Sequence, residues 1–228
     1  MPSVGVLDTE LYTVSEAARL LRVPASKLKW WLEGREAGDD GSNYAPVIRV
    51  EPTGSTAVTW GEFVEAGYLR EYRRRHQVSL QHLRQVIDAL RAEFEVPYPL
   101  APFKPFVGPG RKLVLELERQ LDIPPWLRMV AVVDGQQMLT PAAESFLAQV
   151  EFAEDDPHWA ERLYPAGKGS PVVIDPAFNF GSPTVDGIST EVLTEMVEAG
   201  EPLEDVARDY GLAPERLRYA LAYEWAAA

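Results

Sequence analysis

The chain has 228 residues, which is enough for two modest domains or one large domain. Its hydrophobic content of 46% and charged content of 25% are those of an ordinary soluble globular protein. The absence of cysteine excludes disulfides and thiolate metal sites. No apolar run has the length needed to span a bilayer and the N-terminal residues do not resemble a signal peptide, so we expect a cytoplasmic protein with no membrane partner.

The net charge of −13 is distributed unevenly along the chain. Residues 11–91 contain 12 basic against 10 acidic side chains, whereas residues 92–228 contain 10 basic against 23 acidic ones. A mildly basic front half is compatible with nucleic acid, because affinity for DNA comes largely from neutralised phosphates. The acidic rear half indicates a different partner, or serves only to keep the protein soluble.

Residues 11–33 form the most informative stretch of the front half. Apolar side chains recur at helical spacing on both sides of a break at Val23-Pro24, and Thr13 or Ser15 is placed to cap the first helix. Two short amphipathic helices joined by a tight turn predict a helix-turn-helix, whose second helix enters a DNA major groove. The residues expected to contact DNA here are Arg22, Ser26, Lys27, Lys29 and Trp30.

A predicted hairpin follows, in which residues 46–51 and 57–60 flank a Pro52-Thr-Gly-Ser turn. A hairpin in this position is either a plain structural element or a wing that carries Arg49 and the tip 53–55 to the DNA backbone. A helix beginning near Thr59 ends in Arg73, Arg74 and Arg75. These arginines complement the helix dipole or lie along phosphates.

Ser79 is expected to cap a longer helix whose apolar seam suits packing on the preceding helices or a dimer contact; the seam comprises Leu80, Leu83, Ile87, Leu90 and Phe94. Residues 96–110 hold five prolines, and we expect a domain boundary there whose aromatic side chains pack on a surface. Beyond it, residues 112–116 read as a strand, residues 128–140 as a hairpin around Asp134-Gly135, and residues 141–150 as a short helix.

No constellation in the sequence predicts catalysis, a metal site or a cofactor. The three histidines, His76, His82 and His158, are scattered along the chain. Asp155 and Asp156 beside His158 are read as a solvated acidic turn, because no other reactive residue type is predicted to converge on them. We therefore expect a protein that is not an enzyme.

The rear segment repeats the pattern of the front. After a short strand at residues 172–174 and a Gly/Pro-rich loop, Thr190 is expected to cap a helix that Gly200 ends, and residues 203–224 give a second helix-turn-helix pattern. A shift of 189 residues aligns Lys27 with Arg216 and Lys29 with Arg218. Its acidic surroundings make this copy a poor DNA reader and favour protein binding or dimerisation.

We therefore predict an α+β, mainly α, chain in three parts. These are a winged helix-turn-helix DNA-binding domain at residues 1–95, a proline-rich linker and β-hairpin-containing middle segment at 96–170, and a C-terminal helix-turn-helix-like helical domain at 171–228.

Two stretches resemble known families. Residues 11–33, with Tyr12-Thr-Val-Ser-Glu-Ala-Ala and Leu28-Lys-Trp-Trp, look like the MerR-type helix-turn-helix, although Arg22 stands where a turn glycine is usual and Pro24 where a serine or threonine cap is common. The C-terminal stretch resembles a small bacterial family of unknown function that is encoded beside PIN-domain toxins. The C-terminal motif residues, which we expect to be structural or to bind a partner, are Asp175, Pro176, Gly181, Pro183, Gly187, Arg216 and Arg218.

The order of the parts is similar to that of VapB-type antitoxins over nearly the whole chain. The resemblance implies a dimeric type II antitoxin that binds operator DNA, represses its own operon and neutralises a PIN-domain ribonuclease toxin by direct binding. Neutralisation with acidic side chains that compete with RNA or metal would suit the charge of the rear half. The alternative is a MerR-like ligand-responsive regulator whose middle segment is a sensor with a pocket lined by Trp126, Met129 and Phe146.

Overall fold

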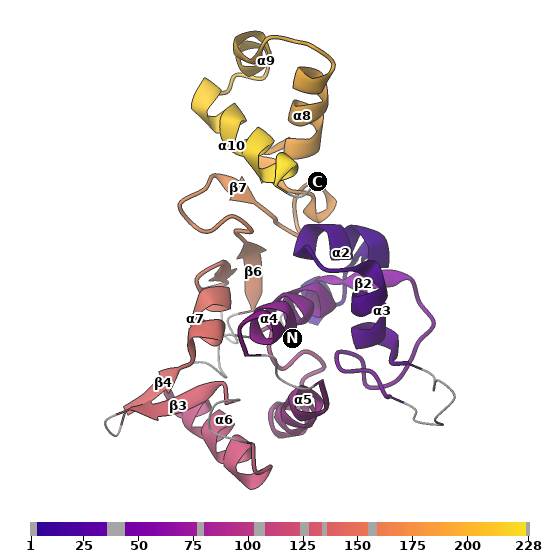
Figure 1. Cartoon of the computed structure of the whole chain (residues 1–228), viewed down its shortest axis with the longest axis vertical. Coiled ribbons are helices and arrows are strands. Elements are labelled where there is room, and N and C mark those ends of the chain that lie inside the picture. The colour runs from indigo at the N-terminus through magenta and orange to yellow at the C-terminus, as the bar shows by residue number, and fades with distance from the viewer. Residues whose placement is uncertain are drawn as a thin grey trace. The chain divides into compact units, whose positions relative to one another are not determined.

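The computed structural model describes residues 4–35, 44–76, 80–102, 108–123, 128–133, 136–154 and 159–226. The chain is α+β and mainly helical, as predicted (Figure 1). It folds into two compact units. The first unit comprises residues 1–147 and 152–160, and the second comprises residues 148–151 and 161–228. Residues 96–147 therefore belong to the same compact unit as residues 1–95, and the three-part division stays a prediction.

The first unit is built mostly from helices with two small antiparallel sheets. Its elements in chain order are α1 (Val4–Leu7), β1 (Glu10–Thr13), α2 (Val14–Leu21), α3 (Ala25–Glu33), β2 (Ala57–Thr59), α4 (Trp60–His76), α5 (Leu80–Phe94), α6 (Gly108–Gln120), β3 (Val130–Val133), β4 (Gln136–Leu139) and α7 (Pro141–Leu147). The boundary between the units falls within β5 (Val150–Phe152) and β6 (Ala160–Leu163).

Helix α4 forms the centre of the first unit. Its residues Trp60, Phe63, Tyr68 and Leu69 are fully buried, and it contacts α1, α2, α3 and α7. Phe146 of α7 meets Tyr68 edge-on, with ring centroids 5.5 Å apart. Phe146 and Met129, which would line a sensor pocket in the alternative regulator hypothesis, are both buried, and Trp126 lies outside the described residues.

The predicted hairpin across residues 46–60 is wrong. Strand β2 pairs with β1 instead, with Tyr12 opposite Val58 and Thr13 opposite Ala57. Residues 47–51 form bends, because the amides of Val47 and Ile48 both donate to the carbonyl of Trp31 at 2.9 Å and their side chains are buried. Two apolar residues that read as one half of a hairpin are thus anchored to the end of α3.

The predicted strand at residues 112–116 is also wrong, because these residues lie inside α6. Val114 and Glu118, four positions apart, are both buried on one helical face. The carboxylate of Glu118 accepts hydrogen bonds from the amides of Met129 at 2.5 Å and Val130 at 3.4 Å. A short apolar run is ambiguous between strand and helix, and here the contact with β3 resolves it.

Other predictions for this unit are confirmed. Strands β3 and β4 form the hairpin at 130–139, although its Asp134-Gly135 turn lies outside the described residues, as do Ser79, Asp155, Asp156 and His158. The α5 seam buries Leu83, Ile87 and Leu90, and α5 contacts α6, the helix that follows it, so packing on the preceding helices stays a prediction. The ring of Tyr98 covers Gly61 so closely that a Cβ there would lie 2.5 Å from it, which confirms that the proline-rich segment packs on a surface.

One buried acid makes the stability of the protein depend on pH. Glu65 of α4 is fully buried and accepts a hydrogen bond from the Leu100 amide at 3.0 Å. Burial raises the pKa of its carboxyl to about 8. Between pH 4.5 and 8 the folded chain therefore keeps a proton that the unfolded chain releases, and stability falls as pH rises through this window.

Replacing Glu65 with glutamine is expected to remove this contribution. The amide retains an acceptor for Leu100 and does not titrate, so the difference in unfolding free energy between Glu65→Gln and the wild type should change by up to about 1.4 kcal/mol per pH unit within the window. Urea unfolding at pH 5, 6, 7 and 8 measures this difference. If it is the same at every pH, Glu65 does not hold the proton.

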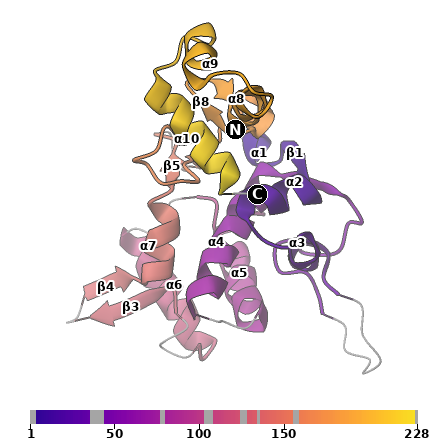
Figure 2. The same ribbon diagram turned by 45° about the horizontal axis from the view of Figure 1, so that its top comes forward.

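The second unit combines a three-stranded antiparallel sheet with three helices, which are gathered together in Figure 2. Its elements are β7 (Val172–Val173), η3 (Asn179–Gly181), β8 (Thr184–Val185), β9 (Ile188–Ser189), α8 (Thr190–Glu198), α9 (Leu203–Asp209) and α10 (Pro214–Trp225). Val172, Val185, Leu193, Val206 and Leu217 lie in one core. Ser189, and not Thr190, caps α8, because its hydroxyl accepts from Val192 at 3.5 Å.

Candidate nucleic-acid interface

Helix α2 begins with a reciprocal cap at Thr13. The Thr13 hydroxyl accepts from the Glu16 amide at 3.2 Å, and the Glu16 carboxylate accepts from the Thr13 amide at 2.7 Å. This arrangement satisfies two backbone donors that a helix start otherwise leaves unpaired. Ala17, Ala18 and Leu21 are buried on one face, so the sequence predicted the start and the core-facing side of α2.

Arg22 turns the chain between α2 and α3. It lies in the left-handed region at φ 52°, where glycine is usual, and its amide donates to the Arg19 carbonyl at 3.0 Å. The amide of Val23 donates to the Ala18 carbonyl at 3.0 Å. These bonds satisfy the last carbonyls of α2, so the turn forms without a glycine, and the Arg22 side chain is exposed.

Helix α3 separates a buried face from an outward one. Leu28, Trp31 and Leu32 are fully buried, whereas the predicted contact residues Ser26, Lys29 and Trp30 are exposed. The guanidinium of Arg35 lies over the ring of Trp30 at 4.6 Å, a cation–π contact that sequence reading missed. The outward face of α3 therefore presents an aromatic surface together with positive charge.

Lys27 is half-buried at the edge of this face. Its ammonium lies 5.5 Å from the centroid of the Trp31 ring. Burial, and then repulsion by Arg73, lowers the pKa of Lys27. Arg73 of α4 is thus close enough to Lys27 of α3 to act on its charge. Arg74 and Arg75 lie in α4 too, but their side chains are outside those that the structure describes.

Arg49 does not point toward solvent, and the prediction that it extends to the DNA backbone is wrong. Its side chain is 7% exposed and bridges Glu33 at the end of α3 and Glu62 of α4. Its Nε donates to Glu62 at 2.6 Å, and its remaining nitrogens donate to Glu33, Glu62, the Thr53 hydroxyl and the carbonyls of Ser55 and Ala57. Arg49 joins two helices and a loop internally.

Glu33, which sequence reading did not single out, holds the loop beside α3. Its carboxylate accepts from the amides of Thr53 at 3.0 Å and Gly54 at 2.8 Å. The loop tip therefore lies at the C-terminal end of α3 although no hairpin carries it. A hollow of about 820 Å³ opens between this loop and α3, and Lys29, Trp30, Arg35 and Val50 are among its lining residues.

The second unit contains a helix pair with the same local geometry. At the predicted shift of 189 residues, Gly211 occupies the turn at φ 67°, its amide donates to Arg208 at 3.1 Å, and the Leu212 amide donates to Ala207 at 2.8 Å. At this shift, the donor and acceptor positions are the same as those of the hydrogen bonds from the Arg22 and Val23 amides. The internal repeat predicted from the sequence is confirmed at the turn and at the first residue of each second helix.

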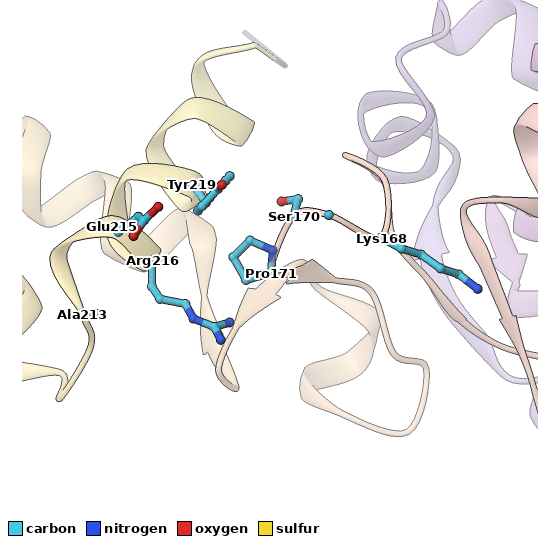
Figure 3. A pocket seen from close by; sticks show the side chains of 8 residues that line it. Lys168, Ser170, Pro171, Ala213, Glu215, Arg216 and Tyr219 are labelled. Atoms are coloured by element: carbon cyan, nitrogen blue, oxygen red, sulfur yellow. The ribbon is translucent and has the colours of Figure 1, made fainter.

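The exposed arginines of this second pair face acids. Arg216 lies 3.1 Å from Asp186, and Arg218 lies 3.9 Å from Glu204. A hollow of about 430 Å³ beside the start of α10 is lined by Arg216 and Lys168, but the two cations do not converge, because Lys168 extends away from the other labelled side chains (Figure 3). This surface lacks the clustered positive charge of α3.

The C-terminal motif residues from Asp175 to Gly187 build one loop, whereas Arg216 and Arg218 lie in α10. Asp175 accepts from Arg162 at 2.8 Å and from the Ala177 amide at 2.8 Å, and Pro176 follows it. Gly181 and Gly187 take positive φ values of 70° and 84°, and the carbonyl of the buried Pro183 accepts from the Thr190 amide at 3.0 Å. The sequence singled these residues out, and the structure shows that they shape residues 175–187.

Among the described residues, no group of three or more His, Asp or Glu side chains is placed to hold a metal ion. In the same part of the chain, no helix combines the length and apolar character needed to cross a membrane.

Comparison with known proteins shows where this architecture recurs. Residues 172–223 match the family described as "Protein of unknown function (DUF433)". An X-ray crystal structure of Rv2018 from Mycobacterium tuberculosis is similar with a TM-score of 0.73 and 30% identity, over 94% of this chain and 99% of that one.

Two proteins of Mycobacterium tuberculosis (strain ATCC 25618 / H37Rv) match nearly end to end. "Uncharacterized protein Rv2308" is 34% identical over 98% of this chain and 93% of its own length. "Putative antitoxin VapB45" is 31% identical over 94% of this chain and 93% of its own length. The chain therefore belongs to the same full-length protein family as Rv2308 and the protein described as "Putative antitoxin VapB45".

Proposed function

We propose that this protein is an antitoxin and operon autorepressor. In this proposal the α2–α3 pair is a MerR-like helix-turn-helix that binds operator DNA, and the acidic second unit binds and neutralises a PIN-type ribonuclease toxin. The protein acts as a cytoplasmic homodimer without catalysis of its own. The observation that carries the proposal is the match to "Putative antitoxin VapB45" along nearly the full length of both chains.

The outward face of α3 supports the DNA-binding half of the proposal. The α2–α3 helix pair exposes Arg22, Lys29 and Trp30. Arg35 follows α3 and stacks over Trp30, and Arg73 is close enough to Lys27 to act on its charge. Cationic side chains on a recognition helix and its flanks contact phosphates, and polar ones such as Ser26 read base edges. The loop tip held by Glu33 takes the place of the predicted wing beside the groove.

Charge supports the toxin-binding half. The second unit carries thirteen acidic side chains against five basic ones. A ribonuclease must present positive charge to its RNA substrate, so an acidic surface is complementary to the face that an antitoxin has to cover.

Co-expression with the product of the adjacent gene tests the proposal. We expect the adjacent gene to encode a PIN-domain protein that co-purifies with the full-length chain. The PIN-domain protein should regain ribonuclease activity when it is separated from the full-length chain. The matched control is the same toxin co-expressed with an unrelated acidic protein of similar size. An adjacent gene of another class, or a toxin that remains active in the presence of excess chain, contradicts the antitoxin function.

A further inference from the structure

The loop around η3 exposes two large aromatic side chains in the second unit. Phe178 is 51% exposed and Phe180 is 83% exposed, the highest value among the large hydrophobic residues described as exposed. Exposed aromatic side chains are typical anchors of protein interfaces, because they bury much apolar area and lose little rotamer freedom on binding. Two of them on one short loop therefore distinguish this part of the surface.

The backbone holds this loop in an unfavourable conformation. Asn179 at φ 47°, Phe180 at φ 52° and Gly181 at φ 70° follow one another in the left-handed region. A bulky residue such as phenylalanine is a genuine outlier there, and it persists only where the surrounding structure imposes it. The contacts of the flanking residues supply that restraint.

Asp175 fixes the start of the loop through Arg162 and the Ala177 amide. The amide of Gly181 donates to the Phe178 carbonyl at 3.0 Å, and the Phe178 ring lies 3.4 Å from the position of a Cβ at Gly187. Phe178 thus packs partly over Gly187, whereas Phe180 projects. The motif residues of this segment hold Phe180 in a defined position before any partner arrives.

A groove lies next to Phe178, and acidic side chains surround the cation in its lining. It has a volume of about 300 Å³ and is lined by residues that include Arg162, Tyr164, Asp175 and Phe178. The one cation among its described lining residues, Arg162, lies within 4.0 Å of Glu151, Glu161 and Asp175. Asp175 lines the groove, whereas Glu151 and Glu161 lie beside Arg162 outside the lining. The three acids outnumber the one cation, so the net charge around Arg162 is negative and favours a cationic side chain from outside.

We propose that Phe180 and this groove are the docking site for the basic, RNA-contacting face of the toxin. The proposal rests on the antitoxin function proposed above and assigns the contact to one surface. Phe180 supplies the apolar anchor, and the acids around Arg162 receive a lysine or arginine of the toxin. Because the loop is held before binding, docking loses little conformational freedom.

Replacing Phe180 with asparagine tests the assignment. Asparagine tolerates the left-handed region, so the melting temperature of Phe180→Asn should equal or exceed that of the wild type. Affinity for the purified toxin, measured by calorimetry with the full-length chain, should fall by roughly 30-fold, as for the loss of an interface anchor. Tyr219→Gln, which removes an exposed aromatic from α10 of the same unit, is the control and should bind as the wild type does.

The outcomes separate this inference from the function on which it rests. If the wild type does not bind the toxin, the antitoxin function fails. If the wild type and Phe180→Asn bind the toxin equally, or if Tyr219→Gln alone loses binding, the function stands and the docking site is wrong. Loss of self-association in Phe180→Asn, seen by light scattering with toxin affinity unchanged, would assign the loop to a second copy of this chain and overturn the proposal.

Discussion

On the proposed function, replacing Lys27 and Lys29 together with alanine is expected to weaken binding to the operator DNA by roughly 100-fold, since each charge-assisted contact contributes about 1.5 kcal/mol. The loss should be similar on unrelated DNA sequences, because lysines at phosphates position the protein without reading bases. The dependence of log affinity on log salt should become shallower by about two units, one for each phosphate contact removed. Fluorescence anisotropy at several salt concentrations measures both quantities.

The control for this experiment is Lys168→Ala combined with Arg208→Ala. These substitutions remove the same charge from the second unit, and Arg208 is 70% exposed. They should leave affinity and salt dependence close to those of the wild type. If both double variants lose affinity equally, total charge and not α3 determines binding. An unchanged Lys27/Lys29 variant would mean that another surface contacts the DNA.

Replacing Arg49 with methionine is expected to lower the free energy of unfolding by about 3 to 5 kcal/mol. The substitution keeps much of the side-chain volume but leaves the partly buried carboxylate of Glu33 and the buried carboxylate of Glu62 without their counter-charge. It also removes the donors to the Ser55 and Ala57 carbonyls. Urea unfolding monitored by circular dichroism measures the loss.

Two further variants make this prediction specific. Arg208→Met, at an exposed position, should change stability by at most about 0.5 kcal/mol. Adding Glu62→Gln to Arg49→Met should restore part of the loss, because it removes one of the two uncompensated charges. A loss below about 1 kcal/mol in Arg49→Met would contradict the buried bridge.

The Arg49→Met variant also distinguishes a buried ion-pair bridge from a DNA contact. Under conditions in which the variant remains folded, Arg49→Met should retain the salt dependence of the proposed DNA binding, because no phosphate contact is removed. A salt dependence that is shallower by about one unit would instead return Arg49 to the DNA surface.

Local patterns predicted most of the helices, with α1 and α6 as the exceptions. The α2–α3 pair, the start of α4 near Thr59 and the repeat at α9–α10 depend on apolar spacing and turn chemistry within about ten residues, so the sequence contains the information. The exposure of Ser26, Lys29 and Trp30 could be predicted in the same way, because a helix with one buried face presents the other outward. Arg22 shows the limit of turn chemistry, since it takes a conformation for which glycine is usual.

The errors lie where distant contacts decide. The sequence of residues 46–51 is typical of a strand. However, β2 pairs with β1, which precedes the α2–α3 pair in the chain. Residues 112–116 have an apolar pattern that fits strand and helix alike, and contact with β3 favours the helix. In both cases the intrinsic preference of a residue for strand or helix is about 1 kcal/mol or less, and tertiary packing overrides it.

By itself, the sequence determined the positions of the two helix pairs, the basic and acidic halves, and the motif from Asp175 to Gly187. Only the tertiary structure decided that Arg49 is buried between Glu33 and Glu62, that Glu33 holds the loop beside α3, and that the C-terminal motif presents Phe180 to solvent. The physical reason is that a residue type fixes which bonds a side chain can make. Its partners, which lie up to tens of residues away along the chain, fix which of those bonds it makes.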